Sequence, residues 1–297
     1  DEIYKLVNDG RAFQTELRAL RMIAEEDGQL QNLCSLYAWG ETNTEDIMYL
    51  RMESIPISLV ESKELMYDAT IEMKLKLCQN IAGGIALALN HIHSLGIIHA
   101  DVKIDNIMLR EDYTPVLIDF SNSGFMDSDG KLIQHRDNFV GGAFCCASPE
   151  MLVYMIRYFG SHGYGNNGNK KDWETMYAQE DVTANTDVYS LGCLMFGILC
   201  GERSNNFKSS DVEMLPKCHE CTLVQVWKLN TIYSSLSPCV KSFVSGMMEI
   251  DTQKRMTTED VLSHRFLCHI ESNIVDSSNK GGEEIVAIHD VEMTLVA

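Results

Sequence analysis

The strongest constraint on the fold is a polar stretch, HADVKIDN at residues 99–106, that runs directly into two short apolar segments. These segments, IMLR and PVLIDF, are separated by the polar residues 111–114. Two apolar runs of strand length on either side of a polar turn predict a β-hairpin. Because hairpin strands are antiparallel, the start of the first lies beside the end of the second. We therefore expect Asn106 and Asp119 to meet at one end of the hairpin.

Asp101 and Lys103 lie just upstream in the same loop, so two carboxylates, an amide and an ammonium group are expected around one small volume. Magnesium prefers one or two carboxylates together with phosphate oxygens and water. The pattern therefore indicates a site suited to magnesium and phosphate. A surface hairpin with polar flanks is the alternative, but it does not explain the order Asp-x-Lys-x-x-Asn followed by Asp at hairpin distance.

The same residues resemble motifs of the eukaryotic protein kinase catalytic domain of the serine/threonine type. HADVKIDN resembles the catalytic loop H-R-D-x-x-x-x-N, and Asp119-Phe120-Ser121 resembles D-F-G. GGAFCCASPE ends like the segment that closes with A-P-E, and residues 185–201 resemble the long central helix of the larger lobe. The run 251–267 resembles the end of the domain, with Arg255 in its characteristic place. These five motifs occur in the right order and cover nearly the whole chain.

The resemblance implies an α+β, bilobal protein-kinase-like fold. A small, partly β N-lobe that lacks the first strands is expected at residues 1–57, a larger and mainly α-helical C-lobe at 58–270, and a C-terminal tail at 271–297. Within the C-lobe we expect the catalytic loop at 99–106, the activation segment at 119–150 and an insertion at about 157–180. Residue patterns predict the individual elements. They are strands at Glu2–Val7, Leu33–Trp39 and Ile47–Glu53, and helices at about Arg11–Glu25, Ile71–Leu95 and Thr186–Cys200.

The resemblance also assigns roles in phosphoryl transfer. Asp101 would accept the proton of the substrate hydroxyl, and Lys103 would reach the transferred phosphate. Asn106 and Asp119 would hold magnesium against the phosphates of ATP. For Asp101, Asn106 and Asp119 the alternative is capping of a turn. Two architectural pairs are implied as well: Asp187 with the backbone of the catalytic loop, and Glu150 with Arg255.

Nucleotide binding is expected to involve Lys5 paired with Glu16, although an exposed lysine on a short strand is an alternative. Met52, Glu53 and Ile55 resemble the hinge between lobes. Met108 falls where the family lines the adenine pocket. Core packing alone would also explain a methionine at either position.

Several features depart from the family pattern. Ala100 replaces the arginine of the catalytic loop, Ser121 replaces a glycine and restricts the backbone, and Ala143 replaces a threonine that commonly contacts the catalytic aspartate. The chain begins with Asp and carries no glycine-rich turn before Lys5, so we expect it to be an excerpt with residues missing upstream. These departures keep a second hypothesis open, a pseudokinase that serves as a scaffold or binding module.

Composition bears on partners and compartment. A formal net charge of −19 argues against nucleic acid and an anionic membrane surface as partners. It agrees with a protein substrate carrying basic residues near its acceptor, a preference that Asp105 also suggests. No secretory signal is visible, so the ten cysteines indicate reduced thiols and an intracellular, cytoplasmic or nuclear, protein. Cys218 and Cys221 have the spacing of half a zinc site, but free thiols in a loop are favoured. The oligomeric state stays open.

Overall fold

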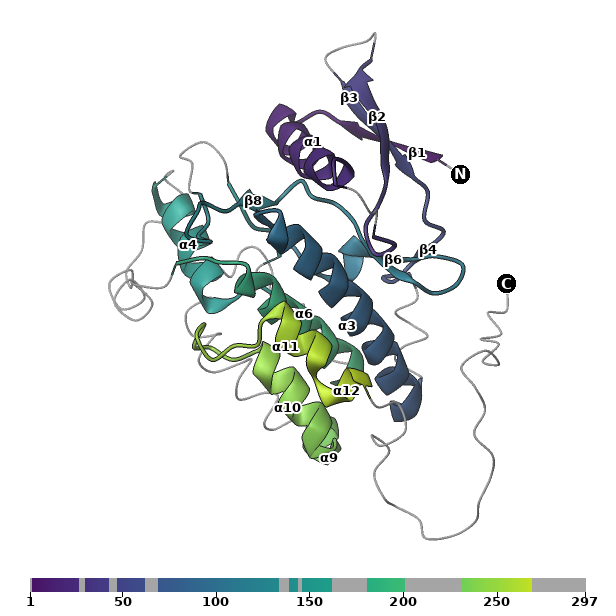
Figure 1. The fold of residues 1–297 in the computed structure, drawn as a ribbon, viewed down its shortest axis with the longest axis vertical. Coiled ribbons are helices and arrows are strands. Elements are labelled where there is room, and N and C mark those ends of the chain that lie inside the picture. The colour runs from purple at the N-terminus through teal and green to yellow at the C-terminus, as the bar shows by residue number, and fades with distance from the viewer. Residues whose placement is uncertain are drawn as a thin grey trace.

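A computed structural model describes residues 2–26, 30–42, 47–61, 69–133, 139–143, 146–161, 181–200 and 231–268. Figure 1 shows a small sheet with one helix, α1, at one end of the molecule and a larger group of helices at the other. The hairpin strand β6 lies between the two parts. The predicted α+β class is therefore confirmed. In the described ranges, no helix combines the length and apolar character that a membrane span requires.

The small sheet consists of three antiparallel strands in the order β1-β3-β2. Its strands are β1 (Glu2–Val7), β2 (Leu36–Glu41) and β3 (Met48–Glu53). β2 begins three residues later than predicted because Leu33 instead forms a bridge to Leu117 of the hairpin.

Helix α1 (Gly10–Ala24) covers this sheet with an apolar face. The side chain of Asp9 accepts hydrogen bonds from the first backbone amides of the helix, as expected for an N-cap. Phe13, Leu17 and Leu20 are buried against the strands, and Glu16 lies within the same buried face. A buried carboxylate needs an ion-pair or hydrogen-bond partner, so a partner for Glu16 is expected close to this face of the helix.

The predicted hairpin is confirmed as β6 (Ile107–Leu109) and β7 (Pro115–Leu117). β4 (Ile57–Ser58) extends it into a three-stranded sheet, and the 3-10 helix η1 (Ile104–Asn106) leads into it. A separate pair joins β5 (Ile97–Ile98), just before the polar loop, to β8 (Gly124–Phe125), just after the hairpin. Both ends of the 99–125 region are thus fixed by backbone pairing.

The larger part is helical. Its elements are α3 (Ile71–Ser94), α4 (Pro149–Ser161), α6 (Asn185–Cys200), α9 (Thr231–Ser235), α10 (Pro238–Met247), α11 (Thr258–Ser263) and α12 (Arg265–Cys268). α6 is buried on nearly all sides, as its apolar composition predicts, and it packs against α3 and α10. Helix α4 continues to Ser161 and so includes the first residues of the predicted insertion. Residues 162–180, 201–230, which contain Cys218 and Cys221, and 269–297 lie outside the described ranges.

Two close contacts hold the helices in position. Gly84 of α3 lies so close to Asn32 and Pro115 that a Cβ atom would overlap both, which explains a glycine in the middle of a helix. The Arg255 guanidinium forms a bidentate ion pair with Glu150 of α4, at 2.6 and 3.1 Å, and both side chains have no exposed surface. The pair expected from the sequence is therefore present in the core.

Candidate active site

The hairpin brings its two ends together as predicted. The backbone amide of Ile118 donates to the carbonyl of Asn106 at 3.0 Å, so Asn106 and Asp119 lie at the same end. The Nδ2 atom of Asn106 donates to the backbone oxygen of Asp101 at 2.8 Å and to its Oδ2 at 3.0 Å. The asparagine thus joins the polar loop to the hairpin.

Asp101 is buried, with 4% of its surface exposed, and accepts hydrogen bonds from several segments. Lys103 Nζ donates to Oδ2 at 2.8 Å, and the backbone amide of Ala143 donates to Oδ1 at 2.8 Å. Burial alone would lower the pKa of Lys103, but the hydrogen bond to Asp101 and its charge outweigh burial and raise it. Lys103 is therefore cationic at neutral pH.

Lys5 links the small sheet, helix α1 and the hairpin. Its Nζ lies 2.8 Å from a carboxylate oxygen of Glu16 and 2.8 Å from Oδ1 of Asp119. Burial would lower the pKa of Lys5, but the two carboxylates outweigh burial and raise it. The predicted pairing of Lys5 with Glu16 is present, and the contact with Asp119 connects it to the proposed metal ligand.

Asp119 is held in its ionised form. Burial would raise its pKa, but the charge and hydrogen bond of Lys5, together with hydrogen bonds from Ser121, lower it to about 2. Because this value lies below the ordinary 3.8, ionised Asp119 stabilises the folded chain above about pH 4, and that contribution is lost as the pH falls toward 2. The hydroxyl of Ser121 donates to Oδ1 at 2.7 Å. The left-handed backbone conformation falls on Asp119 itself, at φ 64°, and Ser121 does not share it.

Asp187 of α6 fixes the backbone of the polar loop. Its carboxylate accepts hydrogen bonds from the amides of His99 and Ala100, both at 2.8 Å, and lies 2.9 Å from the His93 ring. Ala100 has a φ of 62°, a conformation unfavourable for a residue with a Cβ atom. The ring of His99 packs edge-on against Phe120, with 5.0 Å between centroids. The predicted contact of Asp187 with the loop is thus present and holds it in a strained shape.

One small apolar cluster contains Met52 and Met108, which were predicted to line an adenine pocket, together with Ile55 of the predicted hinge. Cys34 and Val116 complete its buried part. Glu53 differs, because its carboxylate is paired with Arg110 and accepts from Ser35. The side chain of Glu53 is therefore engaged away from the apolar cluster, and its backbone amide donates to the carbonyl of Ser35 at 2.9 Å.

The side chains at the end of the hairpin offer oxygen ligands to a magnesium ion. Among the described residues, both hydrogen bonds of the Asn106 side chain use its nitrogen, so the carbonyl oxygen accepts none of them. Those that Asp119 accepts go to Oδ1, which leaves Oδ2. One carboxylate and one amide oxygen fit a small cation that keeps water and phosphate ligands. In the described ranges no group of three or more His, Cys, Asp or Glu side chains is arranged to hold a metal ion.

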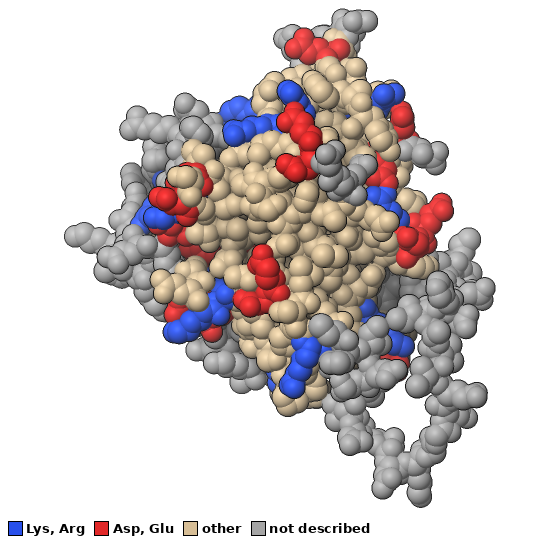
Figure 2. Space-filling model, in the orientation of Figure 1, with Lys and Arg blue, Asp and Glu red and all other residues tan. Residues whose placement is uncertain are grey.

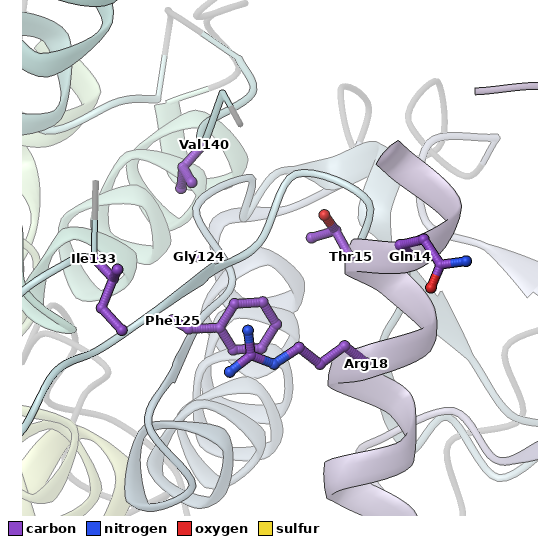
Figure 3. A pocket seen from close by; sticks show the side chains of 7 residues that line it. All are labelled: Gln14, Thr15, Arg18, Gly124, Phe125, Ile133 and Val140. Carbon is purple, nitrogen blue, oxygen red and sulfur yellow. The ribbon is translucent and has the colours of Figure 1, made fainter. Parts of the chain in front are cut away.

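A pocket of about 280 Å³ lies between α1 and the segment that follows the hairpin (Figure 3). The Arg18 guanidinium lies over the ring of Phe125, 3.7 Å from its centroid, and so ties α1 to β8. None of the predicted adenine-pocket residues belongs to its lining. The lining residues are Gln14, Thr15, Arg18, Gly124, Phe125, Ile133 and Val140.

Sequence reasoning missed two contacts of the site. Asn122 Nδ2 donates to Asp101 Oδ2 at 3.2 Å, and Gly142 packs directly against the Asp101 carboxylate. The position of Asn122, three residues after a candidate metal ligand, was the available signal for the first contact. No local pattern indicates the second, because it depends on where the chain returns 41 positions later.

Gly142→Ala should disturb Asp101 directly. An added Cβ would overlap Oδ1 and Cγ of Asp101, and that carboxylate is held by hydrogen bonds and cannot move aside freely. We expect the phosphate transfer that the sequence motifs predict to fall by about 100-fold, since displacement by about 1 Å has such an effect on a reacting group. Gly83→Ala is the matched control, because no atom lies within 4 Å of its added Cβ. Equal rates in the two variants would contradict this prediction.

Comparison with known proteins agrees with this geometry. Residues 5–267 match the family described as protein kinase domain. The chain is 24% identical over 274 residues to serine/threonine-protein kinase BCK1/SLK1/SSP31 of Saccharomyces cerevisiae, covering 89% of this chain and 16% of that protein. It is 25% identical over 269 residues to maternal embryonic leucine zipper kinase of Xenopus laevis, covering 90% of this chain and 34% of that protein. It is 26% identical over 229 residues to serine/threonine-protein kinase 33 of Bos taurus, covering 74% of this chain and 40% of that protein.

The chain spans less than half the length of each of these relatives. The family match, in contrast, extends over most of the chain and includes every residue of the site described above. The chain belongs to the protein kinase family.

Proposed function

We propose that the chain is a protein serine/threonine kinase that transfers the γ-phosphate of ATP to a hydroxyl group of a protein. The observation that carries the proposal is the convergence of Lys103 and Asn106 on Asp101, beside Asp119 with its partner Lys5. Phosphoryl transfer mainly requires that the reacting oxygens be positioned and that charge on the moving group be offset. The described site gathers side chains suited to both tasks.

Asp101 orients the substrate hydroxyl and accepts its proton. Among the described residues, its Oδ1 atom accepts one hydrogen bond, from the amide of Ala143, and a carboxylate oxygen has room for a second donor. Lys103 leaves its contact with Oδ2 to neutralise charge on the transferred phosphate. Lys5, oriented by Glu16, contacts the phosphates of ATP that remain with the nucleotide.

Asn106 and Asp119 hold magnesium through the oxygens that their hydrogen bonds leave available. When bound, the ion offsets negative charge on the ATP phosphates. The adenine ring is assigned to the cluster of Met52, Ile55 and Met108, with the backbone of Glu53 at its edge.

The proposed substrate carries basic residues near the acceptor hydroxyl. Figure 2 shows small, interspersed groups of acidic and basic side chains on one face, so the negative charge is not gathered into a single area there. Support comes instead from Asp105, which is exposed in the catalytic loop next to Asn106, and from the net charge of −19.

A scaffold without catalysis is the second candidate, favoured by Ala100, Ser121 and Ala143 in place of the usual residues. Two of these positions have contacts that offset the loss. Ser121 donates to Asp119, and the backbone of Ala143 donates to Asp101. We therefore favour the enzyme.

Asp119→Asn tests nucleotide binding. Mg-ATP should raise the melting temperature of the parent, because a ligand that binds the folded state stabilises it by about 2.7 kcal/mol at a concentration of 100 Kd. The substitution removes the carboxylate that would hold magnesium and the charge that pairs with Lys5, so the shift should disappear. Differential scanning fluorimetry with Mg-ATP, and with ATP plus EDTA, measures it.

Asp112→Asn is the control for this experiment. Asp112 caps the hairpin turn by accepting from the amide of Thr114, which an asparagine can also do. Its shift with Mg-ATP should equal that of the parent. A parent without any shift would favour the scaffold.

A further inference from the structure

Asn122 reaches Asp101 from outside the catalytic loop. Among the described residues it is the only side chain beyond 99–106 that hydrogen-bonds to the Asp101 carboxylate, at 3.2 Å from Nδ2 to Oδ2. Because an ionised carboxylate can only accept hydrogen bonds, the amide nitrogen must be the atom that faces it. Asn122 is therefore an uncharged donor to the proposed base.

The backbone of Asn122 is itself well anchored. Its carbonyl accepts a hydrogen bond from the amide of Gly141 at 3.1 Å. The next residue, Ser123, is buried, and its hydroxyl donates to the carbonyl of His99 at 3.4 Å. Asn122 thus lies between the catalytic loop and the returning activation segment, and its backbone is held in place from both sides.

The other donors to Oδ2 have further tasks in the proposed reaction. Lys103 and Asn106 also bond to this atom, at 2.8 and 3.0 Å. An oxygen with two lone pairs does not hold three donors equally well. When Lys103 turns to the transferred phosphate, Asn122 and Asn106 remain as the pair that fills both lone pairs. The carboxylate of Asp101 then keeps its orientation, and Oδ1 stays directed at the substrate hydroxyl.

Ala143 explains why such a donor is needed. Its amide donates to Oδ1, but its methyl side chain can add no hydrogen bond to Asp101. A threonine at this position would supply a hydroxyl. The side-chain donor from the activation segment comes instead from Asn122, which precedes Ala143 by 21 positions.

We propose that Asn122 is a positioning residue for phosphoryl transfer, which holds the carboxylate of Asp101 in the reactive orientation in place of a side chain at position 143. This inference rests on the proposed kinase function. It is separable from nucleotide binding, because no hydrogen bond found among the described residues joins Asn122 to Lys5, Asn106 or Asp119.

The test uses the full chain with Mg-ATP and the best acceptor from an array of peptides that carry one Ser or Thr each. Asn122→Ala should lower kcat by about tenfold, which corresponds to one modest hydrogen bond to a charged group. The KM for ATP and the melting temperature should remain those of the parent. Asn122→Asp, which keeps the size of the side chain but places a second carboxylate beside Asp101, should lower kcat further.

Second-site rescue separates positioning from a structural role. Adding Ala143→Thr to Asn122→Ala should restore kcat to within about threefold of the Ala143→Thr single variant, because the new hydroxyl can donate to the same carboxylate. Asn80→Ala, which removes an exposed amide that donates to the carbonyl of Tyr113, controls for loss of an asparagine.

Each outcome decides the matter. If the parent is active and Asn122→Ala has an unchanged or a higher kcat, this inference alone is overturned. The same holds if kcat falls together with the melting temperature and Ala143→Thr does not restore it. A parent that phosphorylates no peptide would overturn the proposed function and this inference together. A selective loss of kcat that Ala143→Thr repairs supports it.

Discussion

Asp101→Asn should abolish measurable phosphate transfer while leaving nucleotide binding nearly intact. Loss of a proton acceptor that is held in place costs about 10²–10⁴ in rate. The asparagine also presents an NH₂ group to a site built from donors: Lys103, Asn106 and Asn122 on one oxygen and the amide of Ala143 on the other. Whichever way the amide turns, one donor faces another, so the orientation is lost together with the base.

Incorporation of labelled phosphate into the best peptide of the array measures this effect, and the Mg-ATP melting shift reports binding in the same variant. The shift should match that of the parent, because the described hydrogen bonds of Lys5 and Asp119 do not involve Asp101. Asn106, the other proposed magnesium ligand, keeps its hydrogen bond to the backbone oxygen of residue 101. Asp112→Asn again serves as a control with full activity. Equal incorporation by Asp101→Asn and the parent would rule out Asp101 as the base.

Glu150→Ala should cause the largest loss of stability. It leaves the Arg255 guanidinium in the core without its counterion, although Arg255 still donates to the carbonyls of Glu249, Asn185 and Ile250. Removing one partner of a buried pair costs about 3–5 kcal/mol in the free energy of unfolding. Urea denaturation with a fixed m-value measures the difference.

Two comparisons make this result specific. Lys254→Ala breaks the exposed ion pair with Asp251, and we expect no measurable change in the denaturation midpoint. The double variant Glu150→Leu/Arg255→Met removes both charges and should recover much of the lost stability. A Glu150→Ala variant as stable as Lys254→Ala would show that the ion pair contributes little.

The parts of the site that the sequence predicts are those set by local rules. The hairpin follows from two apolar runs around a polar turn, and it brings Asn106 beside the start of the Asp119 segment. The pairing of Lys5 with Glu16, which the structure contains, was expected from the family resemblance and not from local spacing. Only for the hairpin does the spacing along the chain determine the geometry.

The remaining contacts depend on how distant segments return to the site. Asn122 meets Asp101 only because the activation segment folds back to bring Gly141 and Ala143 alongside. From the sequence, Ser121 in place of glycine is expected to restrict the backbone. The structure instead shows the left-handed conformation on Asp119, while the Ser121 hydroxyl is a donor to it. A substitution rule cannot indicate which neighbour takes the unusual conformation.

The left-handed backbone of Ala100, held by a carboxylate 87 positions further along the chain, means that the catalytic sequence is not a self-contained module. A synthetic peptide of residues 99–119, or a graft of them onto a foreign scaffold, would relax to an ordinary loop without α6 and Asp187. Transplanting this chemistry requires carrying the buried helix with it.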